Sequence, residues 1–276
     1  MTEVSISRGR LWLSKLTGTE GQAAYGTASV LYADAPLGKD TARFIAVVPD
    51  ENSRFPRARK GEVGLEQGWT LAKLVRETIA ADKGKTPRPI VAVVDVPSQA
   101  YGRREEMLGI QLACAAAADA YAQARLAGHP IVSLLVGKAM SGAFLAHGYQ
   151  ANRLVALDDP EVLVHAMGKQ AAARITRRPV SELDEMGERI PPMSYDIRNY
   201  AKLGLLQELI TGVTAGDPTA ADLEKVSGVL AACVADVKAG TARNLANRLT
   251  SDGARTMRAA SIEVRKRLAE QWADPA

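Results

Sequence analysis

The segment GKAMSGAF, residues 137 to 144, carries the residues best suited to chemistry. The apolar run LLV precedes it and a helix-like stretch follows it, so small residues join a strand to a helix. The first N–H groups of a helix lack partners within the helix, and together they stabilise an oxyanion that develops beside them. Small residues suit such a place because a bulky side chain would block a ligand. They are equally typical of a tight packing point, so the pattern alone leaves both interpretations open.

Ser141 is the candidate nucleophile in this segment, because a strand-to-helix turn can expose a hydroxyl. The pattern differs from G-x-S-x-G, since Ala139 stands two residues before the serine. A serine nucleophile also needs a base, and the chain has 3 histidines. We expect His129 at the surface, His147 in a structural or solvent-facing position, and His165 in a packed position. The residues therefore do not favour a serine hydrolase.

Metal and nucleotide chemistry lack their usual motifs. The sequence contains no H-E-x-x-H, no C-x-x-C, no P-loop and no dinucleotide glycine fingerprint, so we expect no metal site. Cys114 and Cys233 lie in alanine-rich helical patterns and are expected to be buried free thiols. The acid pairs at 105–106 and 158–159 are explained by a helix N-terminus and by a turn before a proline.

The composition is that of a globular protein. The chain has 276 residues, of which 47% are hydrophobic and 24% charged, enough for a full core. Its net charge of +4 is spread along the sequence, which favours a solvated surface over nucleic-acid binding. The N-terminus lacks the pattern of a signal peptide, and no run reaches the roughly 18 apolar residues of a membrane span. We expect a cytoplasmic protein that binds neither nucleic acid nor membrane.

Strand and helix patterns alternate along the first part of the chain. Strands are expected at residues 29–34, 43–50, 89–97, 130–138, 153–159 and 161–166, and several are apolar throughout, as in strands buried on both faces. Helices are expected at 69–82 and 104–128. Beyond residue 168 the patterns are helical, apart from a short last strand at 203–210. This favours a single α/β domain over residues 1–276, with a core at about 25–212 and a helical C-terminal extension at 213–276.

The order of four motifs adds a resemblance to a known family. The runs are VAVVDVPSQAYGRREEMLGIQ, a long helix, HPIVSLLVGKAMSGAFLAHG and NRLVALDDPEVLVHAMGKQAAARI. Together they resemble crotonase-like carboxyltransferases, and among these the gamma subunits of biotin-independent malonate decarboxylase, over roughly residues 25 to 212. The resemblance implies an α/β crotonase-like ββα spiral, as in the ClpP/crotonase fold, with perpendicular sheets flanked by helices.

The resemblance also implies candidate site residues. KAMSGAF is similar to a K-A-Y-G-G-A-Y pattern, which makes the backbone N–H groups of Gly142 and Ala143 an oxyanion hole and Ser141 a secondary donor. VDVPSQ is similar to V-D-T-P-G, which places Ser98 at a glycine position near the substrate. AMGKQAA stands where carboxyltransferases have a P-E-G turn, so Lys169 is a candidate ligand for a carboxylate or a phosphate.

The family's partners and chemistry come from the same resemblance. It implies an obligate heterodimer with a beta subunit, and a malonyl thioester on an acyl carrier protein subunit with a phosphoribosyl-dephospho-CoA arm. A separate acyl carrier protein transferase subunit loads the malonyl group. Loss of CO₂ leaves an enolate whose oxygen is held by backbone N–H groups. This chain is then expected to bind no cofactor itself, and no biotin.

Three alternatives remain at the level of sequence. Clp-type serine proteases share the fold, but their A-S-M-G-A-F motif places Met140, not Ser141, at the nucleophile. A carboxyltransferase half of a biotin-dependent acyl-CoA carboxylase or decarboxylase is a closer rival, although KAM at 138–140 is no biotinylation sequence. The third is a non-catalytic scaffold that completes the beta subunit's site, favoured by the lack of a clear acid or base.

Overall fold

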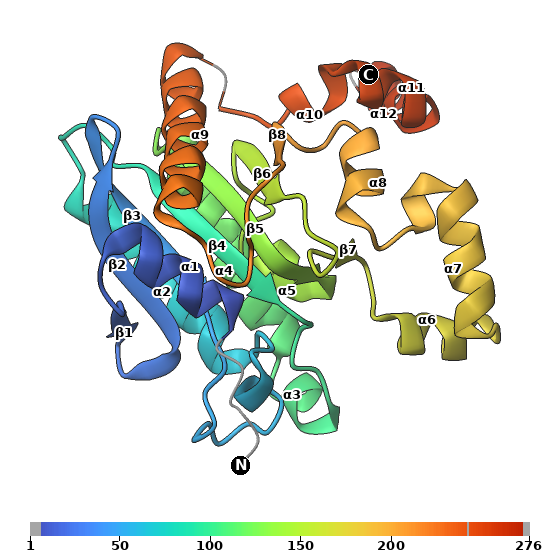
Figure 1. The fold of residues 1–276 in the computed structure, drawn as a ribbon, viewed down its shortest axis with the longest axis horizontal. Coiled ribbons are helices and arrows are strands. Elements are labelled where there is room, and N and C mark those ends of the chain that lie inside the picture. Colours follow the sequence, from blue (N-terminus) through green and yellow to red (C-terminus); the bar gives the residue numbers. More distant parts are fainter. Residues whose placement is uncertain (1–6, 242, 273–276) are drawn as a thin grey trace.

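The structure, a computed structural model, describes residues 7–241 and 243–272, and their strands form one mixed sheet (Figure 1). The strand order is β1-β2-β3-β4-β5-β6-β8, and β7 branches off to pair with β5. The strands are β1 (Gln22–Ala24), β2 (Thr27–Leu37), β3 (Asp40–Val47), β4 (Ile90–Val96), β5 (Ile131–Met140), β6 (Arg153–Leu157), β7 (Val164–His165) and β8 (Glu208–Ile210). The first three are antiparallel, and the pairs from β3 to β8 are parallel. The carboxyl ends of β4 and β5 therefore lie together at the same end of the sheet.

Helices cover both faces of this sheet. They are α1 (Arg8–Thr17), α2 (Leu65–Ala81), α3 (Arg103–Met107), α4 (Ile110–Leu126), α5 (Ser141–Ala146), α6 (Lys169–Thr176), α7 (Val180–Arg189), α8 (Ile197–Lys202), α9 (Ala220–Ala239), α10 (Asn247–Thr250), α11 (Asp252–Met257) and α12 (Ala259–Trp272). Figure 1 shows α1 and α9 over one face, with α2 and α4 behind the other. None of the helices in the two described ranges combines the length and the apolarity needed to cross a bilayer.

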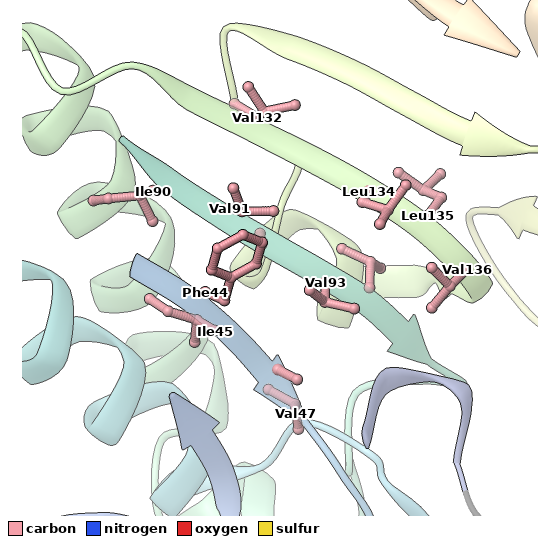
Figure 2. Packing of buried hydrophobic residues seen from close by; sticks show 14 of the residues in the cluster. Phe44, Ile45, Val47, Ile90, Val91, Val93, Val132, Leu134, Leu135 and Val136 are labelled. Atoms are coloured by element: carbon pink, nitrogen blue, oxygen red, sulfur yellow. The ribbon is translucent and has the colours of Figure 1, made fainter. Parts of the chain in front are cut away.

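The central strands β4 and β5 form the middle of the core. In β4 only Asp95 is not fully buried, and in β5 only Lys138 is exposed. Figure 2 shows apolar side chains of β3, β4 and β5 packed along these strands. This confirms the prediction of strands buried on both faces, which parallel sheets require because helices cover them. The strands form a rigid base, and the segments after their carboxyl ends are placed by it.

Close packing of α2 against α4 depends on small residues. A Cβ atom added to Gly68 would lie 2.6 Å from the carbonyl oxygen of Ala113, so any side chain there would force the helices apart. The alanine-rich pattern of α4 supplies the other half of this contact. Residues 108–109 separate α4 from α3, where Gly109 adopts a left-handed φ of 82°.

Several expected elements need correction. The single helix predicted at 104–128 is two helices, because Gly109 takes a backbone conformation that does not continue a helix. The sequence interpretation also missed α1 and β1. The expected perpendicular sheets appear instead as one hydrogen-bonded sheet, from which only β7 branches, at Ala139 and Met140 of β5. Helices α9 to α12 lie in the predicted helical extension. The assignment of the whole chain to one domain stays a prediction.

A partly buried ion pair ties the end of α2 to the start of β4. The Asp82 carboxylate accepts hydrogen bonds from Arg88 Nε at 2.8 Å and Nη2 at 2.6 Å, and Arg88 Nη1 also reaches Asp34 on β2 at 3.0 Å. These bonds from Arg88 lower the pKa of Asp82 to about 2. His129 lies beside the pair, only 2% exposed, with Nδ1 at 2.9 Å from the Arg88 carbonyl oxygen. The prediction that His129 lies at the surface is therefore wrong, because this carbonyl gives its ring a buried partner.

The variant Asp82→Asn tests this anchor through its pH dependence. Because the folded-state pKa of Asp82 is depressed, its contribution is present above about pH 4 and is lost as pH falls toward 2. We expect Asp82→Asn to lower the free energy of unfolding by about 2 kcal/mol at pH 7, and the difference from wild type to shrink below pH 4. Urea unfolding curves at several pH values measure it. A deficit that stays constant down to pH 2.5 would contradict the assignment.

Candidate active site

The turn from β5 to α5 has an unusual backbone. β5 ends at Met140, and the first helical residue, Ser141, has a φ of 61°. This left-handed conformation costs a residue with a Cβ atom about 1–2 kcal/mol, which is why glycine is favoured there. This agrees with the resemblance of KAMSGAF to the K-A-Y-G-G-A-Y pattern, in which a glycine stands at the position of Ser141. The turn directs the start of α5 toward the segment that follows β4.

Gln99, in that segment, meets the turn directly. Its Oε1 atom accepts a hydrogen bond from the Gly142 N–H at 2.8 Å and a longer one from Ser141 Oγ at 3.3 Å. A Cβ atom added to Gly142 would overlap with the same oxygen, so a larger residue there requires the Gln99 amide to move away. The predicted oxyanion donor at Gly142 thus holds a carbonyl oxygen, supplied by the chain itself.

Two cavities open on either side of this contact. The first, of about 560 Å³, is lined at the turn by Ser141 and Gly142 and farther out by apolar residues of α5 and of the segments around α8. The second, of about 370 Å³, lies against α4. Gln99, Gly142 and Leu145 line both. The lining of the first contains no Asp, Glu, Lys or Arg, so a charge that develops on a ligand there would depend on N–H and O–H donors.

Ala143 is placed differently from its neighbour. It is fully buried and lines neither cavity. Of the two backbone donors predicted from the sequence, the structure therefore exposes Gly142 to the cavities and covers Ala143. Ser141 lines the larger cavity, and its role as a secondary donor stays a prediction.

The two predicted substrate-binding residues lie outside the cavities beside the turn. The Ser98 hydroxyl donates to the backbone oxygen of Gln99 at 3.0 Å. The carbonyl oxygen of Ser98 accepts a hydrogen bond from the Val63 N–H. Lys169 pairs with Asp184 at 2.5 Å and lines another cavity of about 320 Å³, between α6 and α7. Their binding roles stay predictions. The side chain at this turn that sequence reasoning missed is Gln99, the next residue after Ser98. Its signal in the sequence was a polar residue in the segment after a buried strand.

The histidines do not supply a base for Ser141. His147 is fully buried between the Tyr121 hydroxyl and the Val93 carbonyl oxygen, and this burial lowers its pKa to about 4. His165 pairs with Met140 in the sheet and lines the larger cavity. Its ring stacks on Tyr195 with centroids 4.0 Å apart, and desolvation lowers its pKa. His147 therefore takes the structural and not the solvent-facing position, and the packed position of His165 is confirmed. The Ser141 hydroxyl is bonded to Gln99 instead.

The cysteines carry no nucleophile either. Both are free, and burial raises the pKa of Cys114 and of Cys233 to about 11, so their thiols stay protonated near neutral pH. Cys233 is buried as predicted, whereas Cys114 is only partly buried and lines the smaller cavity. Among the residues that the structure describes, no three metal-binding side chains gather in one place.

The fold is that of the crotonase-like carboxyltransferases. Transcarboxylase 12S, solved with methylmalonyl-coenzyme A and methylmalonic acid, matches 84% of this chain and 42% of its own with a TM-score of 0.64. At 20% identity this likeness shows the fold alone.

More similar proteins define the family. The family model of the malonate decarboxylase gamma subunit matches residues 58–272, so the chain belongs to that family. It is 54% identical, with a TM-score of 0.91, to a chain in the Pseudomonas malonate decarboxylase hetero-tetramer with coenzyme A, over 96% of this chain and 100% of that one. A chain of the Pseudomonas MdcD–MdcE hetero-dimer is 52% identical, with a TM-score of 0.88, over 96% of this chain and 99% of that one. The Malonomonas rubra malonyl-S-ACP:biotin-protein carboxyltransferase is 33% identical over 76% of this chain and 78% of its own.

Two substitutions at Ser141 test the strain in the turn. Ser141→Gly relieves the left-handed backbone while losing a 3.3 Å hydrogen bond, so we expect its free energy of unfolding to stay within about 1 kcal/mol of wild type. Ser141→Ala loses the same bond and keeps the strain, so it should be less stable than Ser141→Gly by roughly 1 kcal/mol. Urea unfolding of the three proteins gives the order. An alanine variant more stable than the glycine variant would contradict the strained turn.

Proposed function

We propose that this chain, paired with a beta-type subunit, decarboxylates a malonyl thioester carried by an acyl carrier protein. The observation that carries the proposal is the Gly142 N–H, which holds a carbonyl oxygen at 2.8 Å at the junction of two cavities. A thioester oxygen has the same acceptor chemistry as the Gln99 amide oxygen. Membership of the gamma-subunit family supports the choice of malonate as the acyl group.

The chemistry needs a place for negative charge on oxygen. The bond between the carboxylate carbon and the α-carbon breaks, CO₂ leaves, and the electron pair forms an enolate with its charge on the thioester oxygen. A proton then adds to the α-carbon and gives the acetyl thioester. A single oxyanion donor is worth about 3 kcal/mol in such a transition state. The Gly142 N–H supplies this donor and the Ser141 hydroxyl a secondary one, while the N–H of buried Ala143 would contribute only if the turn opened.

The thioester and its carrier are supported by the relatives. The Malonomonas rubra relative is named for malonyl-S-ACP, and one Pseudomonas relative was solved with coenzyme A. We therefore also propose that the carrier bears a phosphoribosyl-dephospho-CoA arm and that a separate transferase subunit loads it. A cytoplasmic location is part of the same proposal. The apolar lining of the larger cavity suits the uncharged part of such an arm.

A beta-type partner is supported by the site's composition and by its surroundings. The titratable side chains that line the larger cavity are His165, Tyr149 and Tyr200. Burial raises the pKa of Tyr200 above its ordinary value. We propose that the proton for the enolate comes from solvent or from the partner. Exposed apolar side chains in α3, α4, α5 and the residues between α3 and α4 would be covered by that subunit: Met107, Leu108, Leu112 and Leu145.

A second function is favoured by one observation. The Malonomonas rubra relative transfers the carboxyl group to a biotin protein, as its name states. In that reaction the same enolate forms at the same donor, but the carboxyl group moves to biotin instead of leaving as CO₂.

Reconstitution distinguishes these functions. We combine the chain with a beta-type partner and malonyl-loaded carrier protein, without biotin or ATP, and measure CO₂ release. The proposal predicts release of CO₂ with one acetyl-carrier formed for each. Carboxyl transfer to a biotin protein, with no CO₂ release in its absence, would favour the carboxyltransferase.

Gly142→Val tests whether the turn takes part in catalysis. Its side chain would occupy the position that Gln99 Oε1 holds, so we expect turnover to fall by roughly 100-fold or more while the complex still assembles. Gly216→Val is the matched control, because an added Cβ atom there has open space. Assembly is followed by gel filtration with the partner. Unchanged turnover in an assembled Gly142→Val complex would support the scaffold role.

A further inference from the structure

Gln99 combines a fixed backbone with a loosely held side chain. The Ala100 N–H donates to the Val63 carbonyl oxygen at 2.7 Å, and the Val63 N–H donates to the Ser98 carbonyl oxygen at 3.0 Å. These bonds hold the segment after β4 against the residues before α2. The Gln99 side chain is held only at its oxygen: among the described residues no acceptor for Nε2 is found, and Oε1 has one bond of ordinary length and one longer.

The orientation of the amide follows from its partners. Gly142 presents an N–H, which can only donate, so the atom that faces it must be the amide oxygen and not the nitrogen. The Ser141 hydroxyl donates to the same oxygen. Gln99 therefore offers the turn a neutral carbonyl oxygen, the group that a thioester substrate also presents.

The position of Gln99 makes this oxygen a competitor of the substrate. Gln99 and Gly142 line both cavities, so the Gly142 N–H lies at their junction with the amide covering it. An N–H group left without a partner in such a half-buried place is unfavourable. An internal acceptor removes this cost while the site is empty.

We infer that Gln99 is a displaceable internal ligand, whose amide oxygen occupies the Gly142 N–H until the thioester oxygen of the substrate takes its place. This inference rests on the proposed function and adds a residue that sets how tightly the site holds its substrate. Displacement exchanges one neutral hydrogen bond for another, and the new bond strengthens as charge develops on the enolate oxygen. The Gln99 side chain moves, and the backbone of its segment stays in place.

Two substitutions at Gln99 should act in opposite directions. Gln99→Ala removes the competitor, so kcat/KM for the malonyl-loaded carrier should rise about 3- to 10-fold, the factor that one ordinary hydrogen bond represents. Gln99→Glu keeps an acceptor of the same length but adds a negative charge, which binds the N–H more tightly and repels the enolate. Its kcat/KM should fall about 10-fold or more. A residue that only supported the fold would lower kcat/KM in both variants.

The experiment uses the complex with the beta-type partner. Wild type, Gln99→Ala, Gln99→Glu and the control Gln123→Ala, an exposed residue of α4, are assayed for CO₂ release and checked for thermal unfolding. The dissociation constant for acetyl-coenzyme A, an unreactive thioester, is measured by calorimetry on the same complexes. It should fall in Gln99→Ala and rise in Gln99→Glu by similar factors, with Gln123→Ala unchanged.

The outcomes separate this inference from the proposed function. A wild-type complex without CO₂ release overturns the decarboxylase proposal, while the calorimetric order of the variants still decides whether Gln99 is displaced. Lower kcat/KM or weaker binding in Gln99→Ala overturns the inference, because Gln99 would then assist the substrate. Equal values in wild type and Gln99→Ala overturn it too.

Discussion

The hydrogen bond from the Gly142 N–H to Gln99 Oε1 joins the two segments on which the site depends. Val96 at the end of β4 pairs with Ala139 near the end of β5, so residues 99 and 142 each follow three positions later. Adjacent parallel strands bring the segments after their carboxyl ends together, and the contact then needs a residue without a side chain at 142. A shift of either strand by one residue would separate donor and acceptor.

The core explains why this contact is placed so firmly. β4 and β5 are buried along almost their whole length, and α2 and α4 approach closely enough to require Gly68. The ion pair of Asp82 with Arg88 fixes the opposite end of β4. With both ends of the strand held, strain can be maintained at Ser141, where a residue with a side chain adopts a left-handed backbone. The site is thus a short irregular segment on a rigid sheet, a common arrangement for catalytic groups.

Much of this fold could be predicted from the sequence, because apolar runs such as IVAVVDV leave little choice of structure. The break between α3 and α4 could not be predicted, because Gly109 lies within a helical pattern and its left-handed backbone is seen only in the folded chain. His129 was misplaced because its partner, the Arg88 carbonyl oxygen, is 41 residues away in sequence. At the site, the importance of GKAMSGAF could be predicted from its small residues. The role of Gln99 could not, since it depends on the alignment of two strands in space.

In the proposed function, the Gly142 N–H receives the thioester oxygen of the substrate. A crystal structure of the complex with its beta-type partner and a malonyl thioester analogue that cannot lose CO₂ tests it most directly. We expect the analogue's thioester oxygen at about 3 Å from the Gly142 nitrogen, with the Gln99 amide turned away. An analogue bound elsewhere in the complex, with Gln99 Oε1 still on the Gly142 N–H, would contradict it.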